Sequence, residues 1–169
     1  MTTKTTYILT IIILTCGLFV LGQNTASIKH EKSNSKFSLS ISTYNHAEQI
    51  FKGTMIYNLT NNNLTIRKRT LFSDKDTILL SKIIETNSIE QIKNIRLDSL
   101  KDFYFNYCVM ATSGNEYFIS TTIDTVKNNI SLHHYYDKQI ERLVNELNKN
   151  IPDNLKLDYL TNETKQDCK

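Results

Sequence analysis

The chain of 169 residues carries 20 lysines and arginines against 17 aspartates and glutamates, which gives a formal net charge of +3. This small excess argues against a duplex nucleic-acid binder, because such proteins concentrate positive charge far more strongly. The sequence contains only four glycines, so it has no glycine-rich loop of the kind that cradles phosphates.

The first 22 residues have the composition of a signal peptide. One cation, Lys4, precedes residues 7–21, which are almost entirely apolar. As a helix this run would measure about 22 Å against roughly 30 Å of membrane hydrocarbon, which is short for a permanent anchor. We therefore predict a signal peptide at residues 1–22, cleavage after Gly22, and export to the periplasm or out of the cell. The alternatives are an uncleaved leader that anchors the protein in the membrane and a lipid modification at Cys16.

Cleavage would leave 147 residues, and because residues 1–22 contain one cation and no acid, the net charge would fall from +3 to +2. A chain of this length is sufficient for one domain with a sizeable core. Its composition predicts a polar linker at residues 23–36, a single α+β domain at residues 37–152 and a polar C-terminal tail at residues 153–169.

Two cysteines, Cys108 and Cys168, remain in the mature chain. An oxidising compartment would allow a disulfide between them, closing a loop of about 60 residues and contributing about 4 kcal/mol. Cys108 lies in an apolar run, whereas Cys168 is the penultimate residue of the polar tail. The alternative is a buried Cys108 thiol without a bridge.

Alternating apolar residues predict strands at the start of the domain. In FSLSIST, which begins at Phe37, every second residue is apolar, as in a strand with one buried face. In YNLTNNNLTIRKR, residues 57–69, two such runs flank three asparagines at positions 61–63. Asparagine adopts left-handed backbone conformations more easily than most residues, so these asparagines predict the turn of a hairpin.

This hairpin carries two of the chain's glycosylation sequons. Asn58 and Thr60 are expected to point away from the apolar face formed by Met55, Tyr57 and Leu59. The sequons are therefore compatible with glycosylation without arguing for it. They begin at Asn58, Asn63, Asn129 and Asn162.

The middle of the chain predicts one more strand and a short helix. The strand is expected near residues 78–84, followed by a turn at residues 86–87. Ser88 and Gln91 have the spacing of a helix capping box. The isoleucines that follow fall on neighbouring helical positions: Ile89, Ile92 and Ile95.

A second strand pair is predicted between Phe103 and Ile123. Aromatic and apolar residues alternate over residues 103–109 and again over residues 117–123. Residues 113–115, Ser-Gly-Asn, are expected to form the turn, since Gly114 supplies the positive φ that such turns require.

The clearest predicted helix covers residues 138–148, with Asp137 as its N-cap. Its apolar residues recur with helical spacing and form one stripe on an otherwise charged rod. We therefore predict an α+β fold: an antiparallel sheet or roll of about six strands, covered on one face by this C-terminal amphipathic helix. The stripe consists of Ile140, Leu143, Val144 and Leu147.

The run Arg67-Lys68-Arg69 is the only dense basic group. On a strand, Arg67 and Arg69 would share one face and Lys68 would lie on the other. One interpretation is a solvated sheet face. The other is a binding site for an acidic or phosphate-bearing ligand or partner.

His133, His134 and Asp137 are the most suggestive group for chemistry. Two imidazoles and a carboxylate can ligate a metal or serve a hydrolase. Adjacent residues, however, seldom point to one centre, and the sequence lacks the usual zinc-ligand spacings. The alternative is a polar, aromatic lead-in to the helix, and we expect no cofactor.

Two resemblances bear on function. FVLGQ at the end of the leader and LVNELNKNIP near the C-terminus resemble small exported proteins of Bacteroidota, which implies export without a catalytic motif. YNLTNNNLTIRKR, followed by ILLSKIIE, a later strand pair and a terminal helix, is similar in element order to pleckstrin-homology-like rolls. That second resemblance implies lipid or peptide binding.

The leading functional hypothesis is an exported, non-enzymatic envelope or secreted protein that binds a partner through a sheet edge or an exposed strand face. The partner would be a protein or another envelope component rather than nucleic acid, with membrane contact only through the leader. One alternative is a small hydrolase that uses His133, His134 and Asp137. A further alternative is an inhibitor or immunity-type protein.

Overall fold

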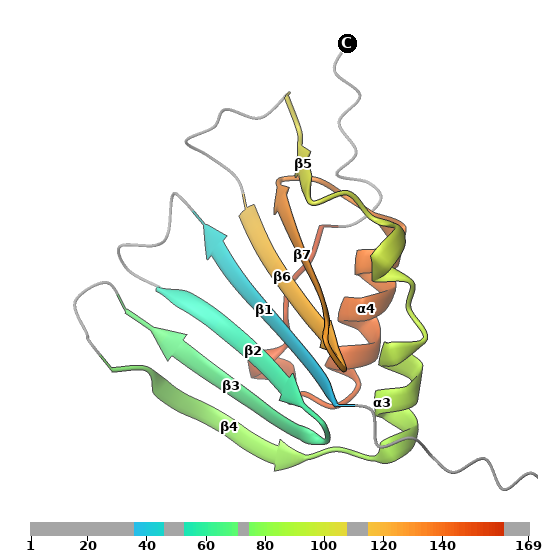
Figure 1. The fold of residues 1–169 in the computed structure, drawn as a ribbon. Helices are drawn as coiled ribbons and strands as arrows, with labels where there is room; N and C mark the ends of the chain where they lie inside the picture. Colours follow the sequence, from blue (N-terminus) through green and yellow to red (C-terminus); the bar gives the residue numbers. More distant parts are fainter. Residues whose placement is uncertain (1–35, 46–52, 71–74, 108–114, 161–169) are drawn as a thin grey trace, which may run out of the picture. The chain divides into compact units, whose positions relative to one another are not determined.

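The computed structural model describes residues 36–45, 53–70, 75–107 and 115–160. The chain divides into two units, and every described residue belongs to the second, which begins at Ser35. In this unit seven strands form one sheet, and two α-helices cover one of its faces (Figure 1). The elements are β1 (Phe37–Asn45), β2 (Thr54–Thr60), β3 (Asn63–Arg69), β4 (Thr77–Ile83), α3 (Thr86–Lys93), η1 (Leu97–Ser99), β5 (Phe103–Phe105), β6 (Asn115–Ile123), β7 (Val126–His133), α4 (Lys138–Asn148) and η2 (Asp153–Leu155), where η denotes a 3-10 helix.

The strands lie in the order β4-β3-β2-β1-β6-β7-β5. Neighbouring strands are antiparallel except β5 and β7, which run parallel. The predicted α+β class is therefore confirmed. The prediction of a purely antiparallel sheet of about six strands is wrong, because the sheet has seven strands and is mixed.

The helical layer also differs from the prediction of one C-terminal helix. Both α3, from the middle of the chain, and α4 bury apolar residues in the same core. The chain continues after α4, and Leu157, Tyr159 and Leu160 are buried in that core as well. The described core thus extends past residue 152, where the composition had suggested the end of the domain, because these three apolar residues stand among polar neighbours.

The predicted hairpin at the asparagine run is confirmed. β2 and β3 are joined by the two-residue turn Asn61-Asn62, and Asn61 has a φ of 54°. Asn63, which was expected in the turn, is the first residue of β3. The register places Tyr57 opposite Ile66, and both side chains are buried. The asparagine turn therefore fixes which residues of the two strands face the core.

Helix α3 begins earlier than predicted. It starts at Thr86, so the expected turn at residues 86–87 is wrong. Glu85 is the N-cap and makes no side-chain capping hydrogen bond, so the predicted capping box of Ser88 and Gln91 is wrong too. The helix is short, as expected, and it is held by the burial of its isoleucines rather than by a cap. The buried residues in α3 are Ile89 and Ile92.

The predicted hairpin between residues 103–109 and 117–123 is wrong. β5 covers only three residues and pairs in parallel with β7, while β6 pairs with β1 and β7. β7 was not predicted as a strand. It follows β6 through a tight turn in which Asp124 has a φ of 55°, and it takes the place beside β6 that was expected for β5. Of the expected turn at residues 113–115, Asn115 is the first residue of β6, and residues 113–114 lie outside the described residues.

Helix α4 has the predicted bounds, Lys138–Asn148. The Asp137 side chain accepts hydrogen bonds from the backbone N–H groups of Gln139 and Ile140 at 2.8 and 3.2 Å, which confirms the predicted cap. The four residues of its apolar stripe are buried and belong to the core cluster of the described residues. The helix is therefore docked on the sheet, as its hydrophobic pattern required.

The opposite face of the sheet carries a row of small polar side chains. Successive side chains along a strand point to opposite faces of the sheet. The buried row of Ile66, Tyr57, Ile41 and Ile119 points toward the helices, so the row formed by the adjacent residue on each strand points away from them. We call this side the polar face. The adjacent row crosses six strands through Ser81, Thr65, Asn58, Ser40, Ser120 and Asn129.

Candidate functional site

Strand β4 forms an exposed apolar edge of the sheet. Among the described strands it pairs with β3 alone. Leu80 is half-buried, and the other six of its seven residues are exposed. The exposed fractions of Ile78, Leu79 and Ile83 are 63%, 39% and 74%. An edge strand with unpaired backbone groups can accept a further strand, and natural proteins usually protect such edges.

A β-bulge divides this edge in two. Ile66 and Arg67 are adjacent on β3, but their partners on β4 are Leu80 and Ile78, so Leu79 is an additional residue. A bulge bends the strand and interrupts the ladder, which protects that position against pairing. The stretch of β4 after the bulge stays in regular register with β3. In an antiparallel ladder, about half of the backbone groups of such an edge strand point outward.

The basic run lies on β3, next to this edge. The register alternates its side chains as the sequence predicted, with Arg67 and Arg69 on the polar face and Lys68 on the helix side. Lys68 lines a hollow there together with Met55. The three basic residues therefore do not form one cluster, since the sheet separates Lys68 from the two arginines.

Asp76 binds both arginines. Its Oδ2 lies 3.3 Å from Arg67 Nη1, and its Oδ1 accepts a hydrogen bond from Arg69 Nε at 2.8 Å. The hydrogen bond from Arg69 is the main reason why the pKa of the Asp76 carboxyl lies below its ordinary value. Asp76 immediately precedes β4, so this group ties the start of the edge strand to β3. Sequence reasoning missed Asp76 because its partners lie on another strand.

His133, His134 and Asp137 have separate partners. His133 is buried, with its Nδ1 3.0 Å from Glu116 Oε1. His134 Nδ1 accepts a hydrogen bond from the Asn115 backbone N–H at 3.5 Å, and Asp137 caps α4. Burial, followed by the charge of His133, lowers the pKa of His134. Among the described residues, no three histidine, cysteine, aspartate or glutamate side chains form a group that could hold a metal ion.

Aromatic side chains gather at the opposite edge of the sheet. The Phe105 ring stacks on the His133 ring at 4.5 Å between centroids, and Tyr107 lies 5.1 Å from Phe105. Tyr107, Phe103 and Phe118 are exposed to 88%, 61% and 46%. The alternation over residues 103–109 had suggested that these aromatic side chains are buried, but Phe103 and Tyr107 are exposed.

The hollow beside Lys68 has a volume of ≈ 680 Å³ and lies at the end of the sheet where β2 begins. Its wall includes Tyr57, whose hydroxyl donates a hydrogen bond to the Leu155 carbonyl at 3.2 Å. Burial, with a contribution from the charge of Asp158, raises the pKa of Tyr57 to about 12. Tyr57 therefore stays protonated at neutral pH and cannot act there as a base.

No protein-family model matches the chain, and no curated protein matches its sequence. Within the described part of the chain, none of the helices has the length and apolar character required to cross a membrane. The predicted leader at residues 1–22 and both cysteines of the predicted disulfide, Cys108 and Cys168, lie outside the described residues.

Proposed function

We propose that the protein is an exported, non-enzymatic binding protein that holds its partner along the edge strand β4. The observation that carries the proposal is the exposure of this strand, in which six of seven residues are exposed and Ile78 and Ile83 are 63% and 74% exposed. An extended segment of the partner would add a strand to the sheet, as in other cases of β-strand addition. Its backbone would pair with the outward N–H and C=O groups of β4.

The side chains of β4 suit this mode of binding. Natural edge strands are usually protected by charged residues, proline or bulges. β4 has no proline and a single charged residue, Lys82, and its bulge at Leu79 leaves the later part of the strand regular. On the polar face, Ile83 and Ile78 can contact apolar side chains of the partner, while Arg67 and Arg69 with one shared acid favour a partner of mildly acidic character.

Export is supported by the composition of residues 1–22, and it makes a protein or another envelope component the expected partner. The hydrolase alternative has less support, because His133, His134 and Asp137 have separate partners. An inhibitor or immunity-type protein remains compatible with the same edge. It would bind one protein and block the activity of that protein.

The test compares two lysine substitutions at apolar residues of similar exposure. Ile83, on the proposed edge, is 74% exposed, and Val126, at the start of β7, is 71% exposed. Each variant should fold, since exposed substitutions usually change stability by less than about 0.5 kcal/mol. Parent and variants are fixed to a support, exposed to envelope extract, and the bound proteins are identified by mass spectrometry.

We expect the parent and Val126→Lys to retain the same partner and Ile83→Lys to lose it, because a lysine on the edge opposes pairing with a further strand. Equal recovery with both variants would contradict binding at β4. Turnover of a substrate that is abolished by His133→Ala would favour the hydrolase instead.

A further inference from the structure

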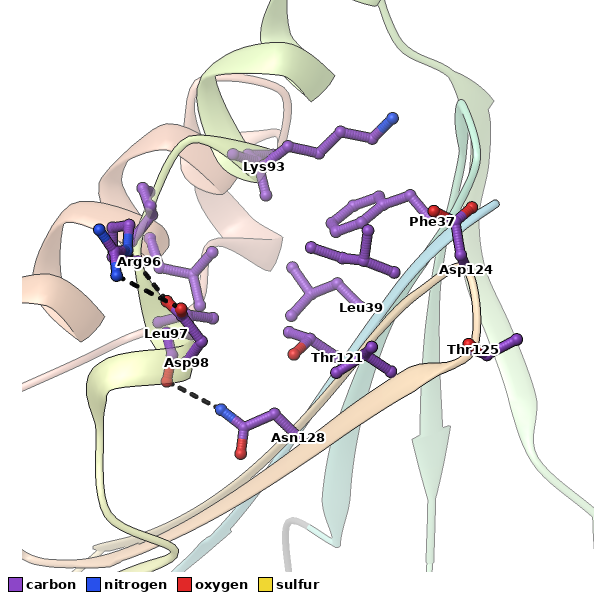
Figure 2. A pocket seen from close by; sticks show the side chains of 15 residues that line it. Phe37, Leu39, Lys93, Arg96, Leu97, Asp98, Thr121, Asp124, Thr125 and Asn128 are labelled. Atoms are coloured by element: carbon purple, nitrogen blue, oxygen red, sulfur yellow. Dashed lines mark hydrogen bonds and ion pairs between the residues drawn. The ribbon is translucent and has the colours of Figure 1, made fainter. Parts of the chain in front are cut away.

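A cavity lies between the sheet and the segment formed by α3 and η1 (Figure 2). Its volume is ≈ 560 Å³, within the roughly 300–1,000 Å³ that is usual for small-molecule sites. Six of the fifteen residues that line it are buried apolar side chains from β1, the α3–η1 segment and α4. These are Phe37, Leu39, Ile92, Ile95, Leu97 and Leu143, all buried.

The sheet breaks its core pattern at this cavity. One row of side chains on the helix side crosses the sheet through Leu64, Leu59 and Leu39, and then continues with Thr121 and Asn128. The neighbouring row remains apolar as far as β7. A threonine and an asparagine at positions where the core requires leucine leave the layer unfilled and bring polar atoms into it. Such departures from a consistent pattern are expected at functional sites.

The two polar residues have different roles in the wall of the cavity. Asn128 Nδ2 donates a hydrogen bond to the Leu97 carbonyl at 2.8 Å, which fixes the amide. In Figure 2 the side-chain oxygen of Asn128 points away from Leu39 and Phe37, so this amide braces the wall of the cavity rather than facing a ligand. The Thr121 hydroxyl lies beside Leu39 on the same wall and can donate or accept.

The charges at the cavity favour a ligand without net charge. Four charged residues line it, two cations and two anions, so their formal sum is zero. Arg96 and Asp98 bind each other, with Nε and Oδ1 3.2 Å apart. Moving an ion into an apolar cavity without an opposite charge is costly. The other two charged residues are Lys93 and Asp124.

We propose that this cavity binds a neutral, mainly apolar small molecule that carries a hydroxyl group. The apolar part of the ligand contacts Leu39 and Leu143, and its hydroxyl forms a hydrogen bond with the Thr121 hydroxyl. This site is separate from the β4 edge, so the two proposals can fail independently.

The test uses 1-octanol as a probe. It compares phenylalanine substitutions at two adjacent threonines of β6, whose side chains lie on opposite faces of the sheet. Thr121→Phe fills the cavity, whereas Thr122→Phe places the same side chain on the polar face of the same strand, where Thr122 pairs with Ser38. Val126→Trp, at an exposed residue that lines the cavity, provides a second blocking variant should Thr121→Phe fail to fold. Binding is followed through the backbone amide signals of the isotope-labelled, purified protein.

We expect 1-octanol to shift the amide signals of Leu39, Thr121 and Asn128 in a saturable manner. Thr121→Phe or Val126→Trp should weaken binding at least about tenfold, and Thr122→Phe should leave it unchanged. Octanoate and octylammonium should bind at least about tenfold more weakly than 1-octanol. Absence of saturable shifts at these residues, or equal binding by the blocking variants and Thr122→Phe, would overturn the site. Equal binding of the two ions would overturn the preference for a neutral ligand.

Discussion

Replacing Leu147 by aspartate tests whether α4 packs on the sheet and whether that packing is required for folding. Leu147 is 1% exposed, and its neighbours Leu143 and Val144 are 0% and 3% exposed. Loss of the leucine side chain alone costs about 2–5 kcal/mol, as Leu147→Ala would show. The aspartate adds an unpaired buried charge, which costs several kcal/mol more. The sum is comparable to the whole stability of a typical domain, about 5–15 kcal/mol.

The assay is urea unfolding at neutral pH, followed by circular dichroism. Asn145→Asp is the matched control, because it places the same carboxylate on an exposed position of the same helix. We expect Leu147→Asp to be unfolded or to have a far lower urea midpoint, and Asn145→Asp to stay within about 0.5 kcal/mol of the parent. If Leu147→Asp unfolds at the same urea concentration as Asn145→Asp, α4 is not docked on the sheet as described.

Two further predictions concern residues once considered for metal binding. Asp137→Ala should lower the free energy of unfolding by about 0.5–2 kcal/mol, because it removes the cap of α4, and Asp137→Asn should retain most of that stability. Burial lowers the pKa of His134, so the unfolded chain takes up its proton first and the folded state loses stability as the pH falls below about 6.5. His134→Asn is a suitable variant because asparagine tolerates the φ of 44° at this position. It should reduce the loss of stability between pH 7 and pH 5 in urea titrations, and an unchanged pH dependence would refute this role of His134.

Two elements could be predicted from short stretches of sequence alone, the β2–β3 turn and helix α4. Asn61 provides the positive φ of the β2–β3 turn, and the apolar stripe of α4 recurs at helical spacing, so both elements were predicted with nearly correct bounds. Thr86 was misleading because a residue common in turns can also begin a helix. Helix α3 depends on the burial of Ile89 and Ile92, which a local pattern of caps does not reveal.

Pairing between distant segments could not be predicted from the sequence. Residues 103–105 alternate as a strand does, but alternation does not indicate which strand lies beside them, and their partner is β7. β7 was missed because Asn128 interrupts its apolar alternation, at the position where the strand lines the cavity. Asp76 was missed although it is only seven residues from Arg69, because the pairing of β3 with β4 is what brings it to both arginines.

The central claim is that the partner pairs with β4, and hydrogen exchange at the β4 backbone tests it most directly. The exchange of each peptide of the protein is measured by mass spectrometry with and without the envelope protein that the parent retains. Pairing predicts that outward amides in Thr77–Ile83 exchange more slowly in the complex, because a new strand accepts their hydrogen bonds. Unchanged exchange in β4, with slower exchange confined to other elements, would contradict the account.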